Sequence, residues 1–138
     1  MVQTIEVIYK DNVLKTINPE ITGLIKKLKE SLQKIYRENL YELYLYGSYA
    51  RNNEDPESDI DIAIILKDFS DYWEEIKRTG SIISSLSLEY DVTISPVRIR
   101  KEDWLKEDTP FLKNLKKEAI LIQSIFFPTA KYYFQNLL

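Results

Sequence analysis

The chain has 138 residues, of which 44% are apolar and 30% are charged, and its net charge is −3. This composition is typical of a globular protein, and the negative balance gives no general attraction to phosphate backbones, so we expect no direct nucleic-acid binding. The chain contains neither cysteine nor histidine, which excludes disulfides, thiolate chemistry, histidine-dependent triads and zinc sites that need either residue.

The first part of the chain predicts a hairpin and then a helix. In residues 3–17, Ile5, Val7 and Tyr9 occupy every second position before a turn signal at Lys10-Asp11-Asn12. This pattern favours two short strands that extend the core. Over residues 19–39 apolar side chains recur at spacings of three and four, which predicts an amphipathic helix. Asn18 is the expected N-cap, because Pro19 follows it at the first helical position.

The middle of the chain predicts two strands separated by a polar loop. Residues 41–46 are aromatic and aliphatic, and they end at a glycine-serine pair. Residues 48–52 can form one helical turn before the loop. Residues 59–66 begin with polar side chains and end with apolar ones on both faces, which is typical of a central strand.

The last part of the chain predicts a helix over residues 70–87, a half-polar strand over 89–95 and a helix over 110–122. An aromatic tail follows over residues 125–138, and we expect it to be partly helical after Pro128. Strands that alternate with helices predict an α/β (α+β) fold with a mixed sheet packed by helices.

The length of the chain favours a single domain over residues 1–138, with its core at about 20–122. No apolar stretch reaches transmembrane length, and the N-terminus lacks the apolar segment of a signal peptide. We therefore expect a cytoplasmic protein without a membrane partner.

Two acidic residues begin the strand predicted over residues 59–66. Asp59 and Asp61 stand two positions apart, so both side chains should point to one face of the sheet. Two carboxylates held so close repel each other unless a cation bridges them or one keeps a proton. Oxygen ligands of this kind suit Mg²⁺, which binds one or two carboxylates together with substrate phosphates.

Gly47 and Ser48 end the preceding strand, and ten residues separate Ser48 from Asp59. The glycine permits a close approach of the backbone, and a helical turn that begins at Ser48 leaves its amide and hydroxyl as donors for phosphate. The two strand ends together predict a site for a nucleoside triphosphate and Mg²⁺. Asp91, on the polar face of the next predicted strand, is the candidate for a third carboxylate that ligates a second metal or accepts a proton.

The spacing Gly47-Ser48, ten residues, Asp59-Ile60-Asp61 resembles the minimal nucleotidyltransferase signature of the DNA polymerase beta superfamily. The surrounding GSYAR and SDIDIAI are also similar to that family, and the resemblance covers residues 20–122. It implies a polymerase-beta-like fold and the transfer of a nucleotidyl group from ATP with Mg²⁺, with pyrophosphate as the leaving group. The sequence departs from the family at Asn52, where glycine is frequent, and this alters the loop rather than the chemistry.

The resemblance also implies roles for single residues. Gly47 and Ser48 would hold the triphosphate, and the acidic residues Asp59, Asp61 and Asp91 would hold Mg²⁺. Arg51 matches a position that assists the phosphates. A surface ion pair of Arg51 with Glu54 or Asp55 is an equally good interpretation of that residue.

Small domains of this family resemble the antitoxin half of toxin–antitoxin pairs whose toxin is a HEPN-domain ribonuclease. Some of these antitoxins are similar to protein adenylyltransferases that move AMP from ATP to a tyrosine of the toxin. Two alternatives remain at this stage: a transferase that acts on a small molecule such as an aminoglycoside-like hydroxyl compound, and an antitoxin that neutralises its partner by binding alone.

Overall fold

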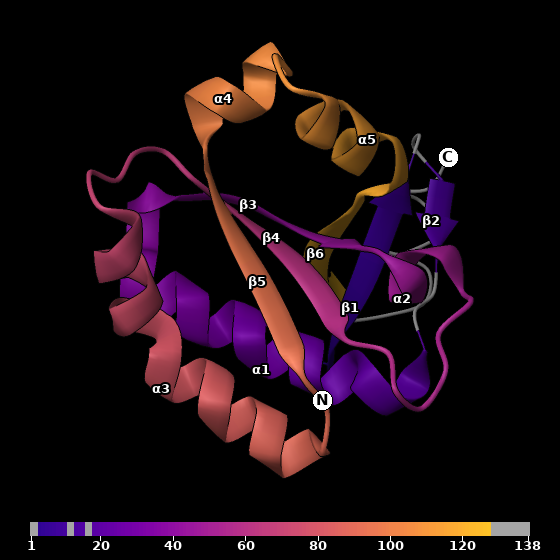
Figure 1. Ribbon diagram of the computed structural model, residues 1–138. Helices are drawn as coiled ribbons and strands as arrows, with labels where there is room; N and C mark the ends of the chain where they lie inside the picture. Colours follow the sequence, from indigo (N-terminus) through magenta and orange to yellow (C-terminus); the bar gives the residue numbers. More distant parts are fainter. Residues whose placement is uncertain (1–2, 11–12, 16–17, 128–138) are drawn as a thin grey trace.

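The computed structural model describes residues 3–10, 13–15 and 18–127. Its elements in chain order are β1 (Gln3–Lys10), β2 (Val13–Lys15), α1 (Pro19–Tyr36), the 3-10 helix η1 (Arg37–Asn39), β3 (Leu40–Tyr46), α2 (Ser48–Arg51), β4 (Ile60–Leu66), α3 (Tyr72–Tyr90), β5 (Ile94–Arg100), α4 (Lys101–Lys106), α5 (Pro110–Glu118) and β6 (Ile120–Phe127). Figure 1 shows the sheet between two groups of helices, α1 with α3 and α4 with α5. The predicted α/β class is therefore confirmed.

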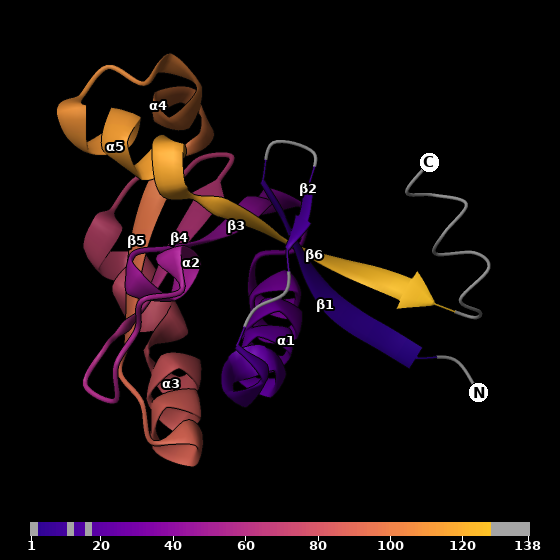
Figure 2. The same cartoon turned by 90° about the vertical axis from the view of Figure 1, so that its right-hand side faces the viewer.

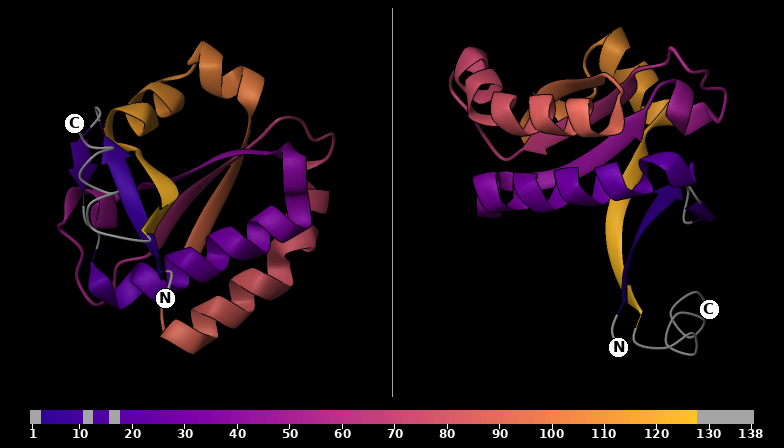
Figure 3. Two further views of the ribbon diagram at one scale, coloured as in Figure 1. Left: turned by 180° about the vertical axis from the view of Figure 1, so that it is seen from behind. Right: turned by 90° about the horizontal axis from the view of Figure 1, so that it is seen from below.

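Six strands form one mixed sheet in the order β2-β1-β6-β3-β4-β5. Strands β4 and β5 are parallel, and the other neighbouring strands are antiparallel. The predicted N-terminal hairpin is present as β1 and β2, and it joins the sheet because β1 pairs with β6. Figures 2 and 3 show β1 and β6 extending together beyond the layers of helices.

Helices α1 and α3 cover one face of the sheet. The cap of α1 is the predicted one, because the Asn18 side chain accepts a hydrogen bond from the Glu20 amide at 2.9 Å. The apolar stripe of α1 packs against every second side chain of the central strands, which places these residues fully inside: Leu24, Ile25, Leu28, Leu32, Leu45, Ile60, Ile62 and Ile64. Burial of this stripe, rather than helix propensity, fixes the position of α1.

Helices α4 and α5 cover the C-terminal part of β4 and β5 on the opposite face. Trp104 of α4 and Leu115 of α5 are buried there against Ile65 of β4. The Trp104 ring lies 4.7 Å from the ring of Tyr44, measured between centroids. This packing holds the end of α5 close to the end of β3, where Gly47 and Ser48 follow.

The predicted strand over residues 89–95 was wrong. Helix α3 continues to Tyr90, and Asp91 ends it in the left-handed conformation with φ of 51°. Tyr90 lies four residues after the buried Leu86 and packs on the same core, so helical spacing continues where we predicted strand alternation. The strand begins later, at Ile94.

The helix predicted over residues 110–122 was wrong at its end. Helix α5 stops at Glu118, and β6 begins at Ile120 and pairs with both β3 and β1. Helix α4 was not predicted. The helix expected after Pro128 lies outside the described residues. In the described part of the chain, no helix combines the length and the apolar character needed to cross a membrane.

The two helical glycines give a stability prediction. Gly80 lies inside α3, and an added Cβ would have no heavy atom within 4 Å. We expect Gly80→Ala to raise the free energy of unfolding by about 0.5–1 kcal/mol, because alanine loses less backbone entropy in a helix. Urea denaturation measures this change.

Gly23→Ala is the matched control, because Gly23 lies in α1 but its added Cβ would sit 2.7 Å from the Tyr90 hydroxyl oxygen. It should therefore gain less stability than Gly80→Ala. An equal gain at both positions would contradict the close packing of α1 against the end of α3.

Candidate active site

The predicted glycine-serine turn lies at the end of β3. Gly47 has φ of 73° and ψ of −155°, which is a conformation that favours glycine. Its carbonyl accepts hydrogen bonds from the amides of Ala50 and Arg51, both at 3.1 Å, and these bonds form the single helical turn α2. The sequence prediction of a turn over residues 48–52 is thereby confirmed.

The two predicted acidic residues lie where β4 begins: Asp59 directly precedes the strand, and Asp61 is its second residue and lies next to this turn. Asp61 is paired with Tyr46 in the antiparallel register of β3 and β4. Ile60 and Ile62 are fully buried on the opposite face, whereas Asp61 is half-buried and Asp59 is exposed. The alternation in the sequence therefore directs Asp61 away from the core beneath α1, as predicted.

Asp61 and Gly47 are in direct contact. A Cβ built on Gly47 would overlap the Asp61 carboxylate oxygen Oδ2. The missing side chain of Gly47 therefore makes the space in which this carboxylate lies. The glycine-serine turn and Asp61, which the sequence predicts as parts of one site, are adjacent.

Negative charge accumulates around Asp61. Burial raises the pKa of the Asp61 carboxyl above its usual range, and the nearby carboxylates of Asp59 and Glu118 raise it further, while Arg51 lowers it. Burial raises the pKa of Tyr46 to about 12, and Asp61 and Glu118 contribute to that rise. Carboxylates whose pKa is raised by burial and by like charges are typical of functional sites.

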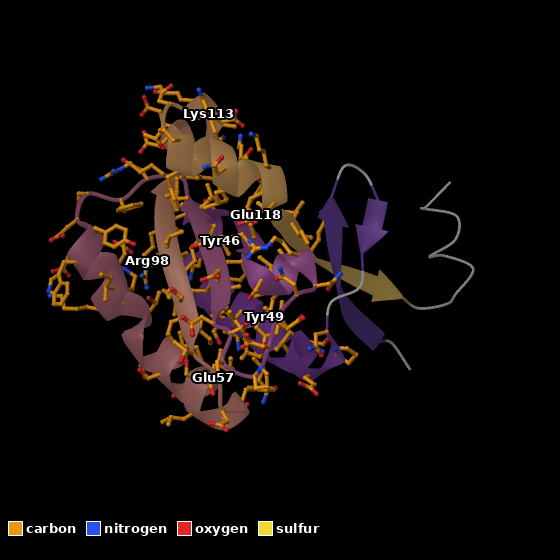
Figure 4. The ribbon with its side chains drawn as sticks, turned by 45° about the vertical axis from the view of Figure 1, so that its right-hand side comes forward. Tyr46, Tyr49, Glu57, Arg98, Lys113 and Glu118 are labelled. Atoms are coloured by element: carbon orange, nitrogen blue, oxygen red, sulfur yellow. The ribbon has the colours of Figure 1, made fainter. Side chains whose placement is uncertain are left out.

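Sequence analysis missed Glu118. One oxygen of its carboxylate, Oε1, accepts a hydrogen bond from the Gly47 amide at 3.2 Å, and the other, Oε2, accepts one from Arg51 Nη1 at 2.6 Å. Arg51 therefore pairs with Glu118 and with neither of the predicted surface partners, Glu54 and Asp55. Figure 4 shows Glu118 at the end of α5, close to Tyr46.

A signal for Glu118 does exist in the sequence. An acidic residue at the last position of a helix is opposed by the negative end of the helix dipole, and Glu118 ends α5 directly after two lysines. A carboxylate at this position is stabilised only if it finds a hydrogen-bond donor or a cation elsewhere in the fold. The signal was hidden because the predicted helix continued to residue 122 and placed Glu118 inside it.

Asp91 is not where the sequence analysis placed it. It is exposed at the end of α3 and lies outside β5. In the parallel register of β4 and β5 the partner of Asp61 is Ser95, which is four positions further along the chain. The polar residue beside the acidic pair on β5 is therefore a serine.

The donor set of the site fits Mg²⁺. Asp59 and Asp61 supply hard oxygen ligands, and a divalent cation would relieve the accumulated negative charge around Asp61. Among the residues that the structure describes, no three acidic side chains gather closely enough to hold a metal by themselves. The predicted third ligand, Asp91, therefore does not complete a set of three with Asp59 and Asp61.

Comparison with known proteins is consistent with this geometry. Residues 25–122 match the family model described as "Nucleotidyltransferase domain". The chain is 39% identical over 82 residues to "Putative protein adenylyltransferase MJ0141" of Methanocaldococcus jannaschii, covering 59% of this chain and 82% of the relative. It is 32% identical over 96 residues to "Putative protein adenylyltransferase MJ0604" of the same organism, covering 69% and 90%.

Two solved structures share the fold. One is described as a "putative nucleotidyltransferase from Sulfolobus solfataricus", with a TM-score of 0.50, 19% identity and coverage of 74% of this chain and 81% of the other. The second is described as a "toxin-antitoxin with AMP-PNP", with a TM-score of 0.50, 21% identity and coverage of 70% of both chains. Asp61 contacts the glycine-serine turn, and one family model matches most of the chain. The protein therefore belongs to the nucleotidyltransferase domain family and is a nucleotidyltransferase.

Proposed function

We propose that this protein is an antitoxin that transfers AMP from ATP to a tyrosine of a partner HEPN-domain ribonuclease and thereby neutralises it. The observation that carries the proposal is the contact between Asp61 and the Gly47 turn, which brings a proposed metal ligand next to the proposed phosphate donors. The names of the relatives and the toxin–antitoxin structure with AMP-PNP support it. ATP, Mg²⁺ and the RNA substrates of such a toxin meet in the cytoplasm, where the proposal places the reaction.

Each residue of the site has a role in this proposal. Asp59 and Asp61 would hold Mg²⁺, which supplies charge neutralisation at the phosphates when it is bound. The Gly47 amide, the Ser48 hydroxyl and the Arg51 guanidinium would bind oxygens of the triphosphate. Asp91 receives no role, because it lies at the exposed end of α3 and Ser95 stands beside Asp61.

The proposed reaction is an in-line displacement at the α-phosphorus of ATP. The tyrosine oxygen of the partner forms a bond to this phosphorus, the bond from the phosphorus to the bridging oxygen of the β-phosphate breaks, and pyrophosphate leaves. The hydroxyl proton of the tyrosine is released to a base or to water. The products are an AMP-tyrosine ester, pyrophosphate and one proton, so atoms and charges balance.

The test combines the purified protein, a candidate HEPN-domain ribonuclease, ATP and Mg²⁺, followed by mass spectrometry of both proteins. We expect the toxin to gain one or more AMP groups on tyrosine and to lose ribonuclease activity at the same time. Reactions without ATP or with EDTA are the controls. Full neutralisation without any mass gain would contradict the transfer and indicate an antitoxin that acts by binding alone.

A further inference from the structure

The Glu118 carboxylate occupies two donors that the proposed function assigns to the triphosphate. Its oxygens accept hydrogen bonds from the Gly47 amide at 3.2 Å and from Arg51 Nη1 at 2.6 Å. Gly47 and Glu118 are 71 positions apart in the chain, so the contact is a product of the fold. The carboxylate of Glu118 thus occupies the position that the proposed function gives to phosphate oxygens of ATP.

Carboxylate and phosphate oxygens accept hydrogen bonds from the same kinds of donor. Both accept charge-assisted hydrogen bonds from backbone amides and from the planar fork of arginine, and a donor engaged by one is lost to the other. The Arg51 side chain is 50% exposed and that of Glu118 is 28% exposed, so both can change partners without disturbing the core.

We propose that Glu118 is a placeholder for the triphosphate, which holds the Gly47 amide and Arg51 in the nucleotide-free protein and releases them when Mg²⁺-ATP binds. This inference rests on the proposed function, because it takes ATP as the ligand of this site. It makes Glu118 a residue that sets nucleotide affinity without touching the reacting atoms.

The position of Glu118 suits such an exchange. It is the last residue of α5, where the helix dipole disfavours a carboxylate, and the charge of Asp61 lies nearby. The negative charge of the bound phosphates would therefore readily displace the Glu118 carboxylate from the Gly47 amide and from Arg51. A ligand needs at least two anionic oxygens to replace both contacts, and a cation held by Asp59 and Asp61 would offset the negative charge that these oxygens bring.

The dissociation constant of Mg²⁺-ATP, measured by isothermal titration calorimetry, tests the proposal. Glu118→Gln should lower this constant about three- to tenfold, because the competing charge is removed while the size of the side chain is kept. Glu118→Ala should change it in the same direction. Glu107→Gln is the matched control, because Glu107 carries the same charge and pairs with Lys116 at 3.1 Å, and it should leave the constant within about twofold of wild type.

A second substitution tests the exchange of Arg51. In the wild type Arg51 must leave Glu118 before it binds phosphate, so Arg51→Gln should weaken Mg²⁺-ATP binding only modestly. In the Glu118→Gln background Arg51 is already released, and the same substitution should weaken binding by a larger factor. Equal factors in the two backgrounds would overturn the exchange.

The outcomes separate this inference from the proposed function. Unchanged or weaker binding by Glu118→Gln would overturn the placeholder and make Glu118 a support of the Gly47 turn, while the transferase proposal would stand. Failure of both wild type and Glu118→Gln to bind Mg²⁺-ATP would overturn both proposals. Circular dichroism of each variant verifies that the fold is retained.

Discussion

Replacement of Asp59 and Asp61 by alanine together should lower the rate of AMP transfer to the toxin by at least about a thousandfold. Both carboxylates are removed from the site in which the proposal places Mg²⁺, and loss of a single charge-stabilising group in such a site already costs a factor of about 100–1,000. The measurement is the initial rate of AMP incorporation at saturating Mg²⁺-ATP. Transfer at the wild-type rate would mean that the chemistry takes place elsewhere.

The fold should survive this double substitution. Asp59 is exposed and Asp61 is half-buried, and the carboxylates of Asp59 and Glu118 act against the charged form of Asp61. Without Mg²⁺, the free energy of unfolding of the variant should therefore equal or exceed that of the wild type. The matched control replaces two exposed aspartates, Asp103 and Asp108, by alanine and should retain transfer.

The central part of the site could be predicted because its signals are local. A glycine-serine pair after an aromatic strand fixes the turn at Gly47, and alternation fixes the face of Asp61. Each of these depends on residues within a few positions along the chain, and the structure places both as expected. The contact between the two strands then follows from their pairing.

The residues that were missed depend on contacts between distant segments. Tyr90 fits the period of a strand and that of a helix, and its packing on the core beneath α1 decides for the helix, so Asp91 ends α3 rather than entering β5. Ile120 fits a helix as well, but pairing with Leu45 of β3 makes it part of β6. The position of Glu118 follows from that choice, because a helix that ends there turns its carboxylate toward Gly47.

Gly47→Ala should lower both the stability of the fold and the rate of transfer, because it introduces backbone strain and a steric overlap. The backbone at φ of 73° and ψ of −155° strains any residue with a Cβ by about 1–3 kcal/mol. The Cβ would also overlap the Asp61 carboxylate, with the Asp61 Cγ only 3.0 Å away and its Cβ 3.3 Å away, so rotation of the carboxylate alone gives too little relief. We expect a loss of about 2–4 kcal/mol in the free energy of unfolding, measured in urea.

The contributions of backbone strain and of steric overlap can be separated by a double-mutant cycle with Asp61→Ala. In the Asp61→Ala background the overlap with the carboxylate is gone while the backbone strain remains, so Gly47→Ala should cost less there than in the wild type. Gly80→Ala, which places the same methyl group in open space, controls for the effect of alanine itself. An equal cost of Gly47→Ala in both backgrounds would show that the Asp61 carboxylate does not occupy the space beside Gly47, and the joint site for metal and triphosphate would then lose its geometric basis.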